Sequence, residues 1–217
     1  YSLPILKDIK MLDYACGVGH FITQFFNFHK DKKDSITALG VEKDTRLAKT
    51  SKIATFMNNV SAEIKAQNAL KTGIIQNHNF SYLLCNPPYS VDEFLKVLDE
   101  KSRNDFELFN KDLNIATNSI ECFFIEKASK VLETNALMAI IVPSSVLGKS
   151  GIYERTREIL LRDFRIISIC DFGSETFYKT GTNVNVIFAI RKAINNTTSI
   201  NKAEIFSDFY KLILENN

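Results

Sequence analysis

Short apolar segments alternate with amphipathic segments along most of this 217-residue chain, and no other feature limits the fold as much. The apolar segments have the length and the branched or aromatic composition typical of strands. They are residues 10–14, 37–42, 63–68, 82–86, 137–142, 166–172 and 184–191. Helical periodicity appears between them, at residues 20–30, 45–57, 118–133 and 152–163. We therefore predict an α/β domain with a mostly parallel sheet and helices on both faces.

Composition and charge exclude several classes of protein. The longest apolar run near the centre, residues 136–142, is far shorter than the roughly 20 residues of a membrane-spanning helix. Cys16, Cys85, Cys122 and Cys170 lie far apart without a C-x-x-C pair, so we predict a protein of the reducing cytoplasm without a metal site. A formal charge of +2 is small for a protein that binds nucleic acid unaided.

Two segments interrupt the alternation and suggest the domain boundaries. Residues 90–117 are polar and charged, and long segments of this kind are usually functional or disordered. Residues 195–199 have linker composition and precede an amphipathic stretch at 203–214. We predict one domain over residues 1–193, and we assign residues 194–217 to a linker and the start of a following segment. The chain opens with Tyr1 rather than Met, so we expect it to be a piece of a longer protein.

A turn with two glycines follows the first predicted strand, in the sequence Asp13-Tyr14-Ala15-Cys16-Gly17-Val18-Gly19-His20-Phe21. Glycines there allow a sharp turn and a ligand close to the backbone, although a single G-x-G also occurs for steric reasons alone. Glu42, at the end of the next strand, favours the functional interpretation because its carboxylate can accept both ribose hydroxyl groups. Ile22 replaces the third glycine of G-x-G-x-x-G, so we predict a ligand without a pyrophosphate.

The tetrapeptide Asn86-Pro87-Pro88-Tyr89 follows the fourth predicted strand, at the edge where α/β proteins bind ligands. Its prolines give a rigid, extended backbone without N–H groups. The Asn86 side-chain oxygen and the Pro87 carbonyl could each accept a hydrogen from an exocyclic NH2 group, while Tyr89 stacks on the attached ring. Two such acceptors free the delocalised lone pair of the nitrogen for attack without a dedicated general base. The structural alternative is a Pro-Pro turn with a surface tyrosine.

Together these features resemble the class I methyltransferases that use S-adenosylmethionine. The glycine turn is similar to their motif I, and Asn-Pro-Pro-Tyr is similar to motif IV of those that methylate amino groups. The resemblance implies a Rossmann-like, seven-stranded sheet with the last strand antiparallel. It also implies that S-adenosylmethionine is bound by Asp13, Ala15, Gly17, Gly19, Phe21, Glu42 and Asn68. Asp13 would hold the cationic amino group of the cofactor. Asn68 stands where these enzymes usually place an adenine-contacting Asp, but a helix-cap or turn role explains it equally well.

The C-terminal third favours DNA as the substrate. Residues 140–147 and 172–183 resemble segments of the modification subunits of type I restriction-modification systems and of the fused type IIG enzymes. This resemblance, over residues 11–192, implies transfer to adenine N6 in double-stranded DNA, with Asn86, Pro87, Pro88 and Tyr89 as the catalytic segment. Tyr89 and Phe177 would hold the flipped-out base between them. Without the resemblance, Phe177 would be read as a core residue.

The same resemblance implies partners that this chain does not contain. They are a specificity (target-recognition) subunit or domain and an endonuclease subunit or domain, and no membrane is involved. The sequence departs from the family in two respects. Only residues 1–12 precede the glycine turn, where the family has a helical region that supplies part of the cofactor site, and we expect no target-recognition domain within residues 1–217. The alternatives are a protein glutamine N5-methyltransferase, which residues 171–183 disfavour, an enzyme acting on ribosomal RNA guanine, and a non-catalytic DNA-binding or assembly subunit. Cytosine N4 is a lesser alternative, since Asn86 rather than Ser favours adenine by resemblance.

Overall fold

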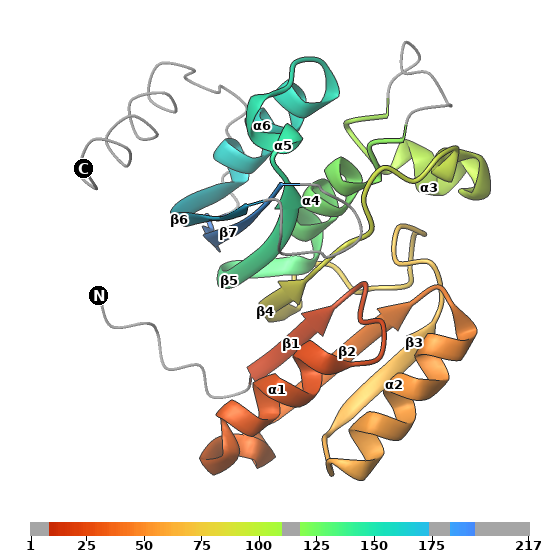
Figure 1. Ribbon diagram of the computed structural model, residues 1–217, viewed down its shortest axis with the longest axis vertical. Helices are drawn as coiled ribbons and strands as arrows, with labels where there is room; N and C mark the ends of the chain where they lie inside the picture. Colours follow the sequence, from red (N-terminus) through yellow and green to blue (C-terminus); the bar gives the residue numbers. More distant parts are fainter. Residues whose placement is uncertain (1–8, 110–117, 174–182, 194–217) are drawn as a thin grey trace.

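A computed structural model of the protein describes residues 9–109, 118–173 and 183–193. Within them, seven strands form one sheet (Figure 1). They are β1 (Ile9–Asp13), β2 (Ile36–Glu42), β3 (Ala62–Ala66), β4 (Phe80–Cys85), β5 (Leu132–Pro143), β6 (Phe164–Gly173) and β7 (Val184–Arg191). The order is β3-β2-β1-β4-β5-β7-β6. The first five strands pair in parallel, and β7 is antiparallel to both β5 and β6. The predicted mostly parallel sheet with an antiparallel last strand is confirmed.

Helices cover both faces of this sheet. The helical segments are α1 (His20–Phe28), η1 (Lys30–Ser35), α2 (Thr45–Met57), η2 (Phe94–Val97), α3 (Glu100–Asn104), α4 (Ile120–Val131), α5 (Ser145–Gly148) and α6 (Ile152–Asp163). α1 and α2 lie side by side over β1 to β3, whereas α4 and α6 contribute to a separate core on the other face (Figure 1). Successive strand residues point to opposite faces. Met11 of β1 therefore belongs to the core under α1 and α2, called the first core here, and Leu12 belongs to the core under α4 and α6, called the second core. None of the described helices is long and apolar enough to cross a membrane.

The segment that follows the tetrapeptide, residues 90–109, contributes to the second core, although its composition suggested a polar loop. Five of its apolar side chains are buried: Phe94, Leu95, Leu98, Phe106 and Leu108. The rings of Phe94 and Phe106 pack edge-on against Phe123 of α4, at centroid distances of 5.0 and 5.2 Å. The spacing of these residues follows neither the helical nor the strand period, so the sequence pattern did not reveal the packing. Residues 110–117 lie outside the described part of the chain.

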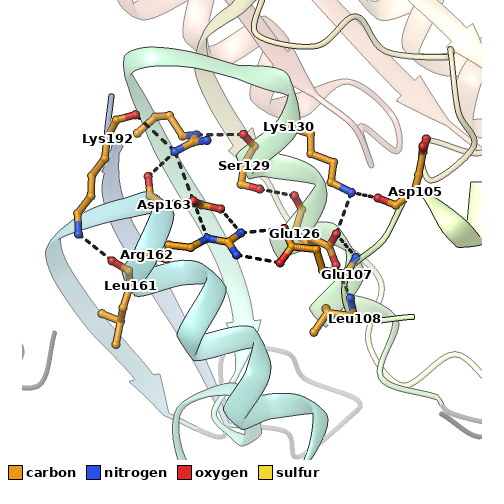
Figure 2. Close-up of polar contacts among 11 residues, drawn as sticks. Asp105, Glu107, Leu108, Glu126, Ser129, Lys130, Leu161, Arg162, Asp163 and Lys192 are labelled. Carbon is orange, nitrogen blue, oxygen red and sulfur yellow. Dashed lines mark hydrogen bonds and ion pairs between the residues drawn. The ribbon is translucent and has the colours of Figure 1, made fainter. Parts of the chain in front are cut away.

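Charged side chains fix the far end of this segment to α4 and α6 (Figure 2). Glu126 of α4 accepts the backbone N–H groups of Glu107 and Leu108 at 2.7 and 3.0 Å, and it pairs with Lys130 at 2.8 Å. Arg162, near the end of α6, donates to both carboxylate oxygens of Glu107 at 2.8 and 3.0 Å. The segment is therefore anchored in the fold by hydrogen bonds as well as by its buried apolar side chains.

Candidate active site

A pocket of about 710 Å³ lies at the carboxyl ends of β1 to β4. Seven of the predicted site residues line it: Ala15, Glu42, Asn68, Asn86, Pro87, Pro88 and Tyr89. They come together because parallel strands end at the same edge of the sheet. The volume is in the range of roughly 300–1,000 Å³ that small-molecule sites occupy.

Glu42 both lines the pocket and holds the glycine turn in shape. Gly17 and Gly19 have φ angles of 52° and 85°, which glycine adopts without strain. A Cβ atom on Gly19 would also lie 2.5 Å from the Ser51 hydroxyl oxygen of α2. The Glu42 carboxylate accepts the Gly17 N–H at 3.0 Å through Oε2 and the Asp44 N–H at 2.8 Å through Oε1. The predicted ribose-binding acid is therefore also a structural part of the turn.

Several predicted residues do not line the pocket. Gly17 and Gly19 shape the turn beside it, and Asp13 is buried behind the turn with 1% of its surface exposed. Phe21 lines a different hollow, formed by α1 together with Leu84. The structure therefore does not bring Phe21 to the pocket. Phe177 lies outside the described residues.

The environment of Asp13 favours its protonated form. Burial raises the pKa of this carboxyl from 3.8 to about 7. The Ala15 N–H, which donates to Asp13 Oδ1 at 3.2 Å, lowers the pKa, and the charge of Glu42 raises it. A carboxyl with this pKa titrates near neutral pH.

We expect Asp13 to make the folded protein less stable as the pH rises from about 4 to about 7, because the unfolded chain releases this proton near the ordinary pKa of 3.8. Between the two values the folded state binds more protons, so the free energy of unfolding falls with rising pH. The decrease is on the order of 4 kcal/mol, at roughly 1.4 kcal/mol for each pH unit. Urea unfolding of the cofactor-free protein across this pH range measures it.

The matched variant for this measurement is Asp13→Asn, whose amide oxygen can still accept the Ala15 N–H but cannot ionise. The contribution of the other titratable groups cancels when the variant is compared with the wild type. A stability difference between the two proteins that stays constant with pH would contradict the prediction.

The tetrapeptide is closed by a hydrogen bond between its first and last side chains. The Tyr89 hydroxyl donates to Asn86 Oδ1. Burial, followed by the charges of Cys85 and Glu121, raises the pKa of Tyr89 above its ordinary value of 10, so the hydroxyl keeps its proton. An amide oxygen has two lone pairs, so Asn86 can accept a second hydrogen from a ligand while this bond is present.

Asn68 forms a turn after β3, as the structural alternative predicted. Its Oδ1 accepts the Leu70 N–H at 3.0 Å, and its main-chain oxygen accepts the Lys71 N–H at 3.1 Å. Its side chain also lines the pocket, so the predicted contact with the adenine of the cofactor stays a prediction.

The two C-terminal segments that favoured DNA as the substrate meet at the same edge of the sheet. After β5, the Ser144 N–H donates to the Asn183 carbonyl at 2.9 Å. Asn185, which is buried, donates to the Ser144 hydroxyl at 2.7 Å. The connection from β6 to β7 leaves at Gly173 and returns at Asn183, so both of its described ends lie at the edge that carries the pocket.

Sequence reasoning missed the apolar wall of the pocket. It consists of Tyr14, Val91, Phe94, Val97, Ile120 and Phe124. The Tyr14 hydroxyl donates to the Phe124 carbonyl at 2.8 Å, which joins the glycine turn to α4. No local signal marks these residues, because apolar side chains at such positions are equally suited to the core. Among the described residues, no group of three or more His, Cys, Asp or Glu side chains could hold a metal ion.

The fold and the site together define a class of protein. The mostly parallel sheet has the antiparallel strand β7 between β5 and β6, and Ala15 of the glycine turn, Glu42 and the tetrapeptide line one pocket. These are the features of a class I S-adenosylmethionine-dependent methyltransferase. Residues 5–215 match the model of the N-6 DNA methylase family. This chain belongs to that family.

Similar proteins agree with this assignment. The methylase subunit of the type I restriction enzyme MjaVII of Methanocaldococcus jannaschii is 29% identical over 96 residues, which are 42% of this chain and 17% of that protein. A Listeria monocytogenes protein described as a class I methyltransferase has a TM-score of 0.71 at 18% identity, covering 92% of this chain and 58% of its own. A type I methyltransferase subunit from Streptococcus thermophilus gives 0.71 at 19% identity, covering 88% and 41%. The chain thus spans between about a sixth and three-fifths of these proteins.

Proposed function

We propose that this chain is the catalytic domain of a DNA methyltransferase that transfers a methyl group from S-adenosylmethionine to adenine N6. The observation that carries the proposal is the shared pocket, in which Asn86-Pro87-Pro88-Tyr89 and Glu42 line the same cavity. Membership of the N-6 DNA methylase family supports it. The catalytic domain would comprise residues 1–193, with residues 194–217 leading into a following segment.

The residues around the pocket fit the cofactor. Glu42 would accept the ribose hydroxyls, since a carboxylate has about four lone-pair sites and two of them serve Gly17 and Asp44. Ala15 and Asn68 line the same pocket, and Gly17, whose left-handed φ favours glycine, leaves the backbone beside it without a side chain. The bound cofactor supplies an electrophilic methyl group on a sulfonium.

On the substrate side, Asn86 and Pro87 would accept the two hydrogens of the adenine amino group. This holds the nitrogen in position and directs its lone pair out of the ring plane, toward the methyl group. The proton is lost after transfer, so no side chain has to remove it beforehand. Tyr89 would stack on the flipped-out base, and we assign the opposite face to Phe177.

We infer that the DNA contacts are shared with other parts of the protein or with its partners. The net charge of +2 is small for a domain that would hold a duplex alone. A specificity subunit or domain would supply target recognition, and an endonuclease subunit or domain would complete a restriction-modification system. A DNA target and free cysteines, three of them buried, support a cytoplasmic location.

Transfer of a radiolabelled methyl group to unmethylated genomic DNA by the full-length protein, with its recognition subunit where one exists, tests the proposal. We expect the label in N6-methyl-2′-deoxyadenosine after digestion of the DNA to nucleosides. Label in N4-methyl-2′-deoxycytidine would correct the target base. Label in a release-factor peptide and not in DNA would favour the glutamine methyltransferase, and cofactor binding without transfer to either would favour a non-catalytic subunit.

A further inference from the structure

Helix α4 carries two glutamates that have no exposed surface, Glu121 and Glu126. A buried carboxylate is costly unless hydrogen bonds satisfy its oxygens. Both glutamates accept backbone N–H groups from the chain that follows the tetrapeptide. Glu121 Oε2 accepts from Ser90 at 3.2 Å, and Glu126 accepts from Glu107 and Leu108 at 2.7 and 3.0 Å. One helix therefore holds both ends of this segment, one beside the pocket and one remote from it.

The contact at Ser90 controls how the chain leaves the tetrapeptide. Ser90 directly follows Tyr89 and has a φ of 49°, in the left-handed region that non-glycine residues adopt at a cost. Such a conformation persists where surrounding contacts hold it. The Glu121 carboxylate supplies a contact of this kind at the Ser90 N–H. This anchor lies one residue after Tyr89, whose hydroxyl donates to Asn86.

Glu121 is itself held from a second side. Its Oε1 accepts the hydroxyl of Tyr153 from α6 at 3.0 Å, and Tyr153 in turn accepts the Ser119 hydroxyl at 3.2 Å. The residue that precedes Glu121, Ile120, lines the pocket, whereas Glu121 does not. The carboxylate thus lies behind the pocket wall, and its hydrogen bond to the site is made through the segment that it anchors.

We propose that Glu121 is a positioning residue for methyl transfer, which aims Asn86 and Tyr89 into the pocket by fixing the backbone at Ser90. The inference rests on the proposed function. Rates of group transfer depend steeply on placement, and a displacement of about 1 Å costs about 100-fold. Loss of the anchor therefore lowers the rate of the chemical step and leaves cofactor binding, on the Glu42 side of the pocket, unchanged.

Two substitutions in the full-length protein separate positioning from simple loss of packing. Glu121→Met fills a similar volume without an acceptor, and Glu121→Gln keeps one carbonyl oxygen for the Ser90 N–H. We expect kcat to fall roughly 10- to 100-fold in the methionine variant and to recover most of this loss in the glutamine variant. The KM for S-adenosylmethionine should stay within about a factor of two of the wild-type value in both.

The matched control is Glu126→Met, which removes the same kind of anchor from the remote end of the segment. We expect it to lower the melting temperature and to leave kcat per folded molecule within about a factor of two of the wild-type value. If Glu121→Met does not fold, the milder Tyr153→Phe takes its place, with an expected decrease in kcat of about threefold. It removes the donor to Oε1 and the acceptor of the Ser119 hydroxyl but keeps the carboxylate and its bond to Ser90.

The outcomes distinguish this inference from the proposed function. A wild-type kcat in folded Glu121→Met, or in Tyr153→Phe where it takes its place, would overturn the positioning role alone, and so would an equal loss of kcat in Glu126→Met. Failure of the wild-type protein to methylate DNA would overturn both proposals.

Discussion

Replacing Asn86 with alanine should slow methyl transfer to DNA by about 100- to 1,000-fold while S-adenosylmethionine binds with near wild-type affinity. Removing one preorganised hydrogen-bonding group that acts on the reacting centre has an effect of this size. Asn86 lies on the tetrapeptide side of the pocket, and its Oδ1 accepts the Tyr89 hydroxyl. The substitution therefore removes an acceptor for the amino group and also the bond that closes the tetrapeptide. Single-turnover transfer of labelled methyl groups measures the rate, and calorimetric titration measures the affinity.

Asn27→Ala is a suitable control for this experiment. Asn27 lies on α1, is exposed and borders the separate hollow rather than the pocket. It should transfer methyl groups at the wild-type rate. Retained turnover in Asn86→Ala would refute the role assigned to Asn86, and a loss of cofactor affinity equal to the loss of rate would move that role to cofactor binding.

The second large effect is expected for Glu42→Ala, which should weaken S-adenosylmethionine binding by at least about tenfold, and on the order of 100-fold if both ribose hydroxyls are bound. A hydrogen bond to a charged group contributes about 1.5–3 kcal/mol, and about 1.4 kcal/mol corresponds to a tenfold change in affinity. The substitution also leaves the Gly17 and Asp44 N–H groups without their acceptor. We therefore expect lower thermal stability of the cofactor-free protein as well.

Calorimetric titration of the full-length protein, together with its melting temperature, tests this prediction. The control is Glu63→Ala on the neighbouring strand β3, where the glutamate is exposed and its nearest cation, Lys65, lies 3.9 Å away. Surface pairs of this kind contribute about 1 kcal/mol or less. Wild-type affinity in Glu42→Ala would contradict the assignment of the cofactor site.

Local patterns were sufficient to predict the fold and to bring seven of the predicted site residues to one pocket. The period of apolar residues shows which segments are strands and which are helices, and alternation of the two gives a parallel sheet. Because Glu42 is the last residue of one strand and Asn86 directly follows another, they lie at one edge of the sheet. A turn with Gly17 and Gly19 and a rigid Pro87-Pro88 pair are likewise readable, because their backbone requirements belong to the residues themselves.

The sequence by itself thus determined the class of fold, the edge that carries the pocket and the polar groups on both sides of it. Only the tertiary structure decided the apolar wall, the bond from Glu42 to Gly17, the distance of Phe21 from the pocket and the anchoring of Ser90 by Glu121. Those features join residues that are far apart in the chain. Their positions depend on how helices pack on the sheet, and an apolar or acidic residue carries no local mark of the partner that it meets after folding.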